Sequence, residues 1–201
     1  MKRLHRPDLY GWSSFDEARD LDFHSVLWVR ADGNVAIDPL PLSSHDGAHL
    51  TTLGGAALIV VTNSDHLRGA TALAAATGAR LAGPRAERGR LGVECTLWLG
   101  EDDQPAPGLR VLGLEGSKTP GELALLLEET TLVTGDLVRA HAGGRLDLLP
   151  EPKLRDRGAA LVSLRRLASL SRVEAVLPGD GWPAFRDGGA LLRELLDSLG
   201  G

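Results

Sequence analysis

The chain has 201 residues, of which 43% are hydrophobic, enough for one large domain with a buried core. Its formal net charge of −5 makes a nucleic acid an unexpected partner, because nucleic-acid-binding domains carry clustered basic residues. A single cysteine, Cys95, excludes an internal disulfide. The longest apolar run, 56–61, is too short to span a bilayer, and residues 1–12 do not resemble a signal peptide. We therefore expect a cytoplasmic protein without a membrane partner.

Strand-like and helix-like segments alternate along the chain. Short β-prone or apolar runs predict strands over 26–29, 35–37, 57–61, 80–82, 109–114, 123–127, 132–134 and 175–177. Apolar residues at helical spacing, or runs of alanine, predict helices over 67–76, 159–170 and 190–199. Asp-Gly-Asn at 32–34 and Glu-Glu-Thr at 128–130 indicate hairpins, and 141–157 is expected to be a long loop. Hairpins mixed with helices favour a layered α/β fold with mixed sheets over a purely parallel sheet.

Three apolar strands end in polar loops that contain an acidic residue. These segments are 58–66 with Asp65, 131–136 with Asp136, and 175–180 with Asp180. Carboxylates gathered at one sheet edge repel each other unless a metal ion, a lysine or an arginine lies among them. A helix cap or a turn explains each of these acids equally well when it is taken alone. The prediction of a functional site therefore rests on the appearance of all three acids together along the chain.

The order of these segments resembles the metallo-β-lactamase fold family. The stretch 60–66, ending in Asp65-His66, is similar to that family's Thr-His-x-His-x-Asp-His motif. Four further matches follow the same order: Ile37-Asp38-Pro39 with the first hairpin, 117–121 with Gly-His-Thr-Pro-Gly, 134–136 with Thr-Gly-Asp, and 177–181 with Pro-Gly-His-Gly. The resemblance implies a single domain over 1–201, folded as a four-layer αββα sandwich of two mixed β-sheets flanked by helices.

The resemblance also implies two metal positions, which this sequence treats differently. Histidines of the first position are replaced by Val61, Asn63 and Lys118, so this position looks absent. The second position keeps four potential ligands, which are Asp65, His66, Asp136 and Asp180. This oxygen-rich set suits one divalent ion, with manganese, iron or magnesium favoured and zinc an option. In a second account no ion binds, and the ammonium of Lys118 replaces the metal charge and pairs with Asp136 or Asp180.

Two functions follow from this resemblance. The first is a metal-dependent hydrolase with at most one ion, in which activated water attacks an ester, thioester, amide, lactone or phosphodiester. In that account Asp65 takes a proton and Lys118 steadies the oxyanion. The second is a catalytically inactive member that serves as a binding or regulatory module. The substrate is an unidentified small molecule, the final helix leaves a homodimer open, and Trp182 either walls a substrate pocket or packs in the core.

Overall fold

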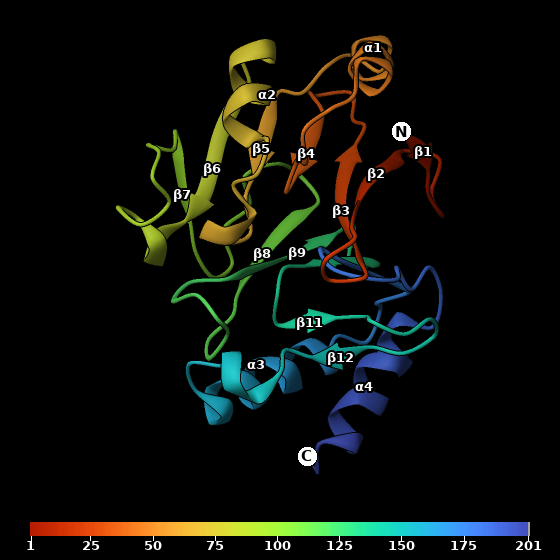
Figure 1. Ribbon diagram of the computed structural model, residues 1–201, viewed down its shortest axis with the longest axis vertical. Coiled ribbons are helices and arrows are strands. Elements are labelled where there is room, and N and C mark those ends of the chain that lie inside the picture. Colours follow the sequence, from red (N-terminus) through yellow and green to blue (C-terminus); the bar gives the residue numbers. More distant parts are fainter. Residues whose placement is uncertain (201) are drawn as a thin grey trace.

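The computed structural model describes residues 1–200, and its larger sheet contains seven strands in sequence order (Figure 1). Strands β1 to β4 pair antiparallel, and β4 to β7 pair parallel. The longest pairing joins β2 and β3 through eight residue pairs, from Leu9 with Trp28 to Asp16 with Leu21. The bounds are β1 Lys2–Arg3, β2 Leu9–Asp16, β3 Leu21–Trp28, β4 Val35–Ile37, β5 Leu58–Val60, β6 Arg80–Pro84 and β7 Leu97–Leu99.

The second sheet has the strand order β13-β10-β9-β8. Its members are β8 (Leu109–Gly113), β9 (Leu123–Leu127), β10 (Thr131–Thr134) and β13 (Ala175–Pro178). Strand β10 is antiparallel to β9 and parallel to β13, so that Thr134 lies opposite Pro178. The loops carrying Asp136 and Asp180 therefore leave the sheet side by side. A separate two-stranded ribbon joins β11 (Val138–Arg139) to β12 (Asp147–Leu148).

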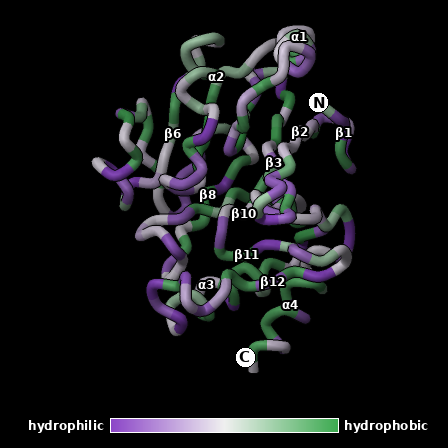
Figure 2. The backbone as a smooth tube through the Cα atoms, viewed as in Figure 1, coloured by the Kyte–Doolittle hydropathy of each residue, from purple (hydrophilic) through white to green (hydrophobic). Residues whose placement is uncertain are grey.

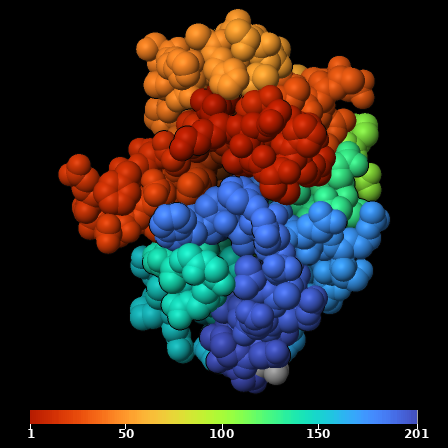
Figure 3. Space-filling view, turned by 90° about the vertical axis from the view of Figure 1, so that its right-hand side faces the viewer, coloured from red at the N-terminus to blue at the C-terminus, as the bar shows by residue number. Residues whose placement is uncertain are grey.

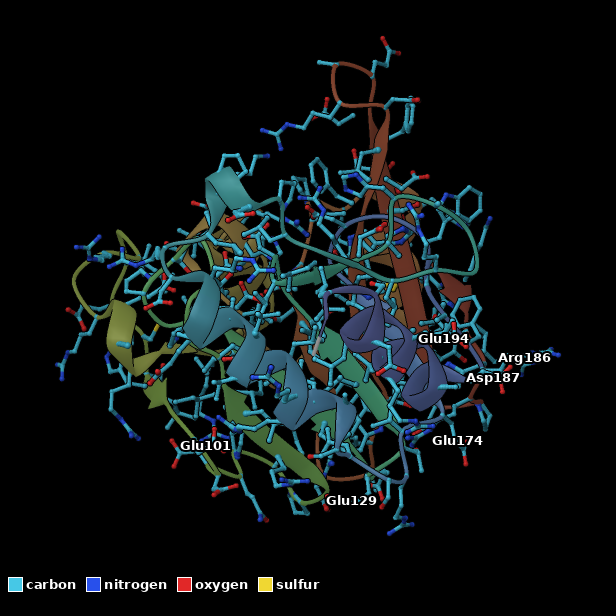
Figure 4. All side chains as sticks on the ribbon, turned by 90° about the horizontal axis from the view of Figure 1, so that it is seen from below. Glu101, Glu129, Glu174, Arg186, Asp187 and Glu194 are labelled. Atoms are coloured by element: carbon cyan, nitrogen blue, oxygen red, sulfur yellow. The ribbon has the colours of Figure 1, made fainter. Side chains whose placement is uncertain are left out.

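Helices cover the outer face of each sheet, so the layers run α, β, β, α (Figure 1). Apolar side chains from both sheets, such as Val60 and Leu125, form the layer between them. The tube in Figure 2 is green along these inner strands. Helices α1 (Ser44–Thr52) and α2 (Ala70–Thr77) cover the first sheet, and α3 (Arg157–Ala168) and α4 (Gly188–Ser198) cover the second. Figure 4 shows α3 and α4 in front of the second sheet, seen from below. The predicted αββα sandwich is confirmed.

The α-helices have 8 to 12 residues, and within residues 1–200 none is long and apolar enough to cross a membrane. Helix α2 begins later than predicted because Arg68 has a φ of 37°, outside the helical region. Gly78 ends it in the left-handed conformation, which glycine adopts at low cost. The predicted loop 141–157 contains β12 and a 3₁₀ turn at Glu151–Lys153, which the short, polar sequence did not signal.

Candidate metal centre

Three buried side chains converge where the two sheets meet. His66 lies in a 3₁₀ turn after β5, Asp136 follows β10, and Asp180 follows β13. The Nε2 atom of His66 is 3.8 Å from Asp136 Oδ1 and 4.0 Å from Asp180 Oδ1. One potential ligand atom from each residue lies within 4.8 Å of the other two. We call these residues the acid–histidine cluster. It joins three of the four ligands expected from the sequence.

Asp38 orients the imidazole of His66. Its Oδ2 lies 2.8 Å from His66 Nδ1, and Thr62 Oγ1 lies 3.1 Å from the same nitrogen. The Asp38 carboxylate accepts hydrogen bonds from the backbone N–H and the hydroxyl of Thr62, at 2.7 and 2.6 Å. These contacts occupy the Nδ1 side of the ring and leave Nε2 facing Asp136 and Asp180. A carboxylate behind a ligating histidine fixes the ring in this way in many metal sites.

Two of the three ligand separations in the cluster fall within the range that one divalent ion allows. Two ligand atoms bound at about 2.1 Å from one ion lie at most about 4.2 Å apart. The separations of 3.8 and 4.0 Å from His66 Nε2 satisfy that limit. One nitrogen and two carboxylates also form a donor set that first-row divalent ions accept. The cluster is thus a three-residue candidate site for an ion.

Two arginines contact Asp180. Arg68 Nη2 lies 3.4 Å from Asp180 Oδ1, and Arg139 Nη2 lies 3.5 Å from Oδ2. Arg68 also donates to the backbone oxygen of His24 at 3.1 Å, and Arg139 is 6% exposed. Both carboxylate oxygens therefore already have a cationic partner. An ion would share Asp180 with these guanidinium groups.

The Asp136 carboxylate is ionised at neutral pH. Burial alone would raise its pKa, but the contacts with His66 and the charges of Lys118 and Arg139 outweigh burial and lower its pKa to about 2. Its Oδ2 accepts a hydrogen bond from Asn63 Nδ2 at 3.2 Å, while its Oδ1 faces His66. One oxygen of Asp136 is therefore available to an ion, and the other is held by the amide of Asn63.

His66 is charged at neutral pH when no ion is bound. Burial lowers the pKa of the imidazole, but the charge of Asp38 and the contacts with Asp136 and Asp38 outweigh that effect and raise the pKa to about 10. The protonated ring compensates part of the negative charge of the carboxylates. A metal ion on Nε2 would have to displace a proton, because a coordinated histidine supplies a lone pair.

Asp65 and Lys118 lie beside the cluster and pair with each other. Their side chains form an ion pair, and each is 43% exposed. Burial lowers the pKa of Lys118, but Asp65, Asp136 and Asp180 outweigh burial and raise it, so the ammonium stays charged. The pairing of Lys118 with Asp136 or Asp180 expected from the sequence is wrong, because Asp65 is its partner. Metal ligation by Asp65 stays a prediction.

The other two residues of the lost metal position have structural roles. Val61 is fully buried in the layer beneath α2. Asn63 caps the 3₁₀ turn by accepting a hydrogen bond from the backbone N–H of Asp65 at 3.0 Å, and its amide nitrogen serves Asp136. Neither side chain has a free donor atom directed at an ion.

Two buried glutamates connect the loops around the cluster. Glu87 accepts hydrogen bonds from the backbone N–H groups of Ser64, at 2.7 Å, and Gly121, at 3.2 Å. Glu122 accepts from Ser117 Oγ at 2.5 Å and from the N–H of Leu137 at 2.8 Å. Burial, followed by the charge of Asp136, raises the pKa of Glu122 to about 8. These bridges tie the His66, Lys118 and Asp136 loops together.

The sequence did not identify several residues that define this site. Asp38 was recognised only as part of a hairpin motif, although an acid directly after a predicted strand is a signal for the same sheet edge. Arg68, Glu87 and Glu122 have no local signal, because a charged residue that becomes buried looks like an exposed one in sequence.

Comparisons with known proteins agree with the fold. A family model described as "Metallo-beta-lactamase superfamily" matches residues 1–199. A metallo-beta-lactamase from Pontibacter korlensis superposes with a TM-score of 0.75 at 18% identity, over 96% of this chain and 96% of that chain. The DIM-1 metallo-beta-lactamase superposes with a TM-score of 0.75 at 15% identity, over 98% of this chain and 96% of that chain. TTHA1623, in a di-iron-bound form, superposes with a TM-score of 0.66 at 23% identity, over 92% of this chain and 98% of that chain. No curated protein shows a significant match.

Proposed function

The chain belongs to the metallo-β-lactamase superfamily, and we propose that it is a metal-dependent hydrolase whose centre holds a single divalent ion. The observation that carries this proposal is the convergence of His66, Asp136 and Asp180, with Asp38 orienting the imidazole. We expect the protein to act in the cytoplasm on a small molecule, without a nucleic acid or membrane partner. The family suggests hydrolysis, and the cluster supplies the ligands.

The donor set favours an ion that accepts oxygen ligands. One imidazole and two carboxylates suit manganese or ferrous iron, and magnesium and zinc are alternatives. A relative of the same fold has been seen with two iron ions, which makes iron a reasonable first candidate. A second ion is not part of the proposal, because Val61 and Asn63 offer it no free ligand atom.

The proposal gives the Asp65–Lys118 ion pair a role in hydrolysis. A bound divalent ion lowers the pKa of a water molecule and polarises a carbonyl or phosphoryl group. The half-exposed Asp65 carboxylate would take a proton from the attacking water, and the Lys118 ammonium would donate a hydrogen bond to the developing oxyanion. Buried Arg139 and Arg68 would hold Asp180 in place. Esters, thioesters, amides, lactones and phosphodiesters are the substrate classes open to this chemistry.

A second candidate function is a metal-free binding or regulatory module. The observation that favours it is the set of protein cations around the carboxylates. Arg68 and Arg139 contact Asp180, and the His66 imidazolium faces Asp136. Together with Lys118 they provide positive charge that an ion would otherwise supply. In this account the ion-pair cluster stabilises the fold.

Metal analysis distinguishes the two candidates. The protein is purified without chelator. Its manganese, iron, zinc and magnesium contents are measured by mass spectrometry and divided by the protein concentration to give the number of ions per chain. The hydrolase proposal expects about one ion per chain and loss of that ion in Asp136→Ala, which removes a ligand. Asp102→Ala serves as the control, because Asp102 is an exposed acid far from the cluster in sequence.

The two possible failures have different meanings. Less than about a tenth of an ion per chain, even after dialysis against manganese or ferrous iron, would overturn the hydrolase proposal and support the metal-free module. Equal metal content in the wild type and Asp136→Ala would place the ion elsewhere on the protein.

A further inference from the structure

A groove of about 720 Å³ lies between the β2–β3 hairpin and the segment that follows Asp180. Figure 3 faces this side of the molecule, where the red and orange N-terminal residues meet the blue C-terminal segment. We call it the hairpin groove. Its aromatic lining comes from both sides, with Trp12 and Phe15 on the hairpin and Trp182 and Phe185 opposite. The three residues of the acid–histidine cluster do not line it.

Exposed aromatic side chains are concentrated in this groove. Residues 1–200 contain four large hydrophobic side chains classed as exposed, and three of them line the hairpin groove: Phe15 at 55%, Trp182 at 63% and Phe185 at 43%. The fourth, Val162, lies on α3. Trp182 therefore does not pack in the core, which was one of the two roles considered for it. Clustered exposed apolar surface of this kind marks binding sites.

Hydrogen bonds hold the hairpin against the turn that carries Asp180. The N–H of Gly181 donates to the oxygen of Asp22 at 2.8 Å, and the N–H of His24 donates to the oxygen of Gly179 at 2.9 Å. Gly181 itself lines the groove and has a φ of +91°. A Cβ at Gly181 would lie 1.9 Å from the oxygen of Ala140, so this turn requires glycine. The groove thus ends one residue from a candidate ligand of the ion.

Size and charge indicate what the groove accepts. Small-molecule sites typically have volumes of about 300–1,000 Å³ and mostly apolar walls with a few polar groups. Among the charged residues in the lining, Asp46 pairs with the amino group of Met1. Lys2 balances one of the two remaining acids, Asp20 and Asp22, so one negative charge is left in the lining.

Neighbouring ionisable groups add little charge. Burial lowers the pKa of both His24 and His141, which line the groove, and this keeps them neutral near pH 7. Arg186 follows Phe185 in sequence, but its side chain points away from the molecule (Figure 4). An aromatic wall with one uncompensated acid disfavours an anionic ligand and is complementary to an uncharged apolar ligand.

We propose that the hairpin groove binds an uncharged small molecule with an aromatic or branched apolar body, and that this molecule is the substrate, with its polar end at the Asp180 turn. The assignment as substrate rests on the proposed function, whereas the binding itself does not. A second copy of the chain is the competing occupant for an exposed aromatic patch, and the experiment includes it as an outcome.

Titration with the neutral fluorophore prodan, a dimethylaminonaphthalene ketone, tests the proposal on metal-free, full-length protein. We expect saturable binding of one molecule per chain with a blue shift in its emission. Trp182→Ser and Phe185→Ser should each weaken binding about tenfold or more, because each removes an aromatic wall. Val162→Ser is the control and should leave binding unchanged, since the exposure of Val162, 55%, lies between those of Phe185 and Trp182, but Val162 lies on α3. Circular dichroism confirms that each variant is folded.

Three outcomes would overturn the proposal. These are no saturable binding, equal binding in all variants, or a change from dimer to monomer in Trp182→Ser with no effect on prodan, which would make the patch a dimer interface. Prodan binding without bound metal in the metal analysis would instead contradict the hydrolase proposal alone. Metal binding without prodan binding would contradict the groove alone.

Discussion

The Nδ1 atom of His66 lies 2.8 Å from Oδ2 of Asp38, although 28 residues separate them in sequence. Asp38 follows β4 and His66 follows β5, and these neighbouring parallel strands bring both residues to one sheet edge. The pair fixes which imidazole nitrogen faces the candidate ligands. Asp38 therefore acts on a metal ion only through His66, as a positioning residue.

Asp38→Asn tests this role. We expect the affinity for Mn²⁺ to fall about 10- to 100-fold, because the amide no longer supports the imidazole as a carboxylate does. Isothermal titration calorimetry measures the affinity. Nitrogen NMR of the His66 ring provides a readout that a merely structural role would not change, since the variant should alter the protonation of Nδ1. Asp102→Asn is the control, and unchanged affinity and ring protonation in Asp38→Asn would contradict the prediction.

Arg139→Met tests competition between an arginine and an ion for Asp180. Arg139 and Asp180 are both nearly buried, so removing the guanidinium should destabilise the metal-free protein by about 3 kcal/mol. Manganese should recover more stability in this variant than in the wild type, because the freed carboxylate oxygen is available to the ion. Urea denaturation with and without manganese measures both effects. Arg145→Met is the control, since Arg145 pairs with Asp147 at the surface.

One result would contradict the prediction that Arg139 and an ion compete for Asp180. Equal destabilisation of Arg139→Met with and without manganese would show that the arginine and the ion do not share Asp180. The same result, combined with absent metal in the wild type, would favour the metal-free ion-pair cluster.

Stability should fall as the pH rises from about 4.5 to about 10. His66 has a folded pKa of about 10, above its ordinary value of 6.5, and Glu122 has a folded pKa of about 8, above its ordinary value of 4.5. The folded state therefore binds these protons more tightly than the unfolded state. Their contributions are complete below the unfolded pKa values and are lost as the pH passes the folded values. The melting temperature of the metal-free protein should decrease from about pH 6 to about pH 9.

Glu122→Gln separates the two groups in this pH profile. Glutamine resembles the protonated acid, so the variant should lose the decline that Glu122 causes between about pH 4.5 and 8 and keep the decline that His66 causes between about pH 6.5 and 10. Differential scanning calorimetry at several pH values measures it. A profile parallel to that of the wild type would mean that Glu122 does not hold the extra proton.

The sequence predicted the strand ends well because strands and their terminal acids leave local patterns. Asp136 and Asp180 meet since β10 and β13 pair in parallel, which the ordered motifs implied. Asp65 lies one residue before His66, yet the 3₁₀ turn capped by Asn63 directs it to Lys118. The side chains of Asp65 and His66 therefore point to different partners from one turn. Their directions depend on tertiary contacts, and the spacing of the two residues in the sequence does not predict them.

Buried charges were harder to predict than strand ends. Arg139 and Glu87 carry no local signal of burial in the sequence. Both are buried because partners from distant segments satisfy them. The residue type alone predicts exposure for each, so only the folded chain identifies them.

Glu87→Gln tests whether this carboxylate holds the His66 and Lys118 loops in register. Glu87 is fully buried and uses one oxygen for Ser64 N–H and the other for Gly121 N–H. Glutamine keeps the shape but presents an NH₂ group to one of these donors, which should cost about 1–3 kcal/mol of unfolding free energy. Urea denaturation measures the loss, and Glu94→Gln, at an exposed position nearby, is the control. If Glu87 positions both loops, amide hydrogen exchange should accelerate at Ser64 and Gly121 together, whereas acceleration at neither would show that the loops keep their register without it.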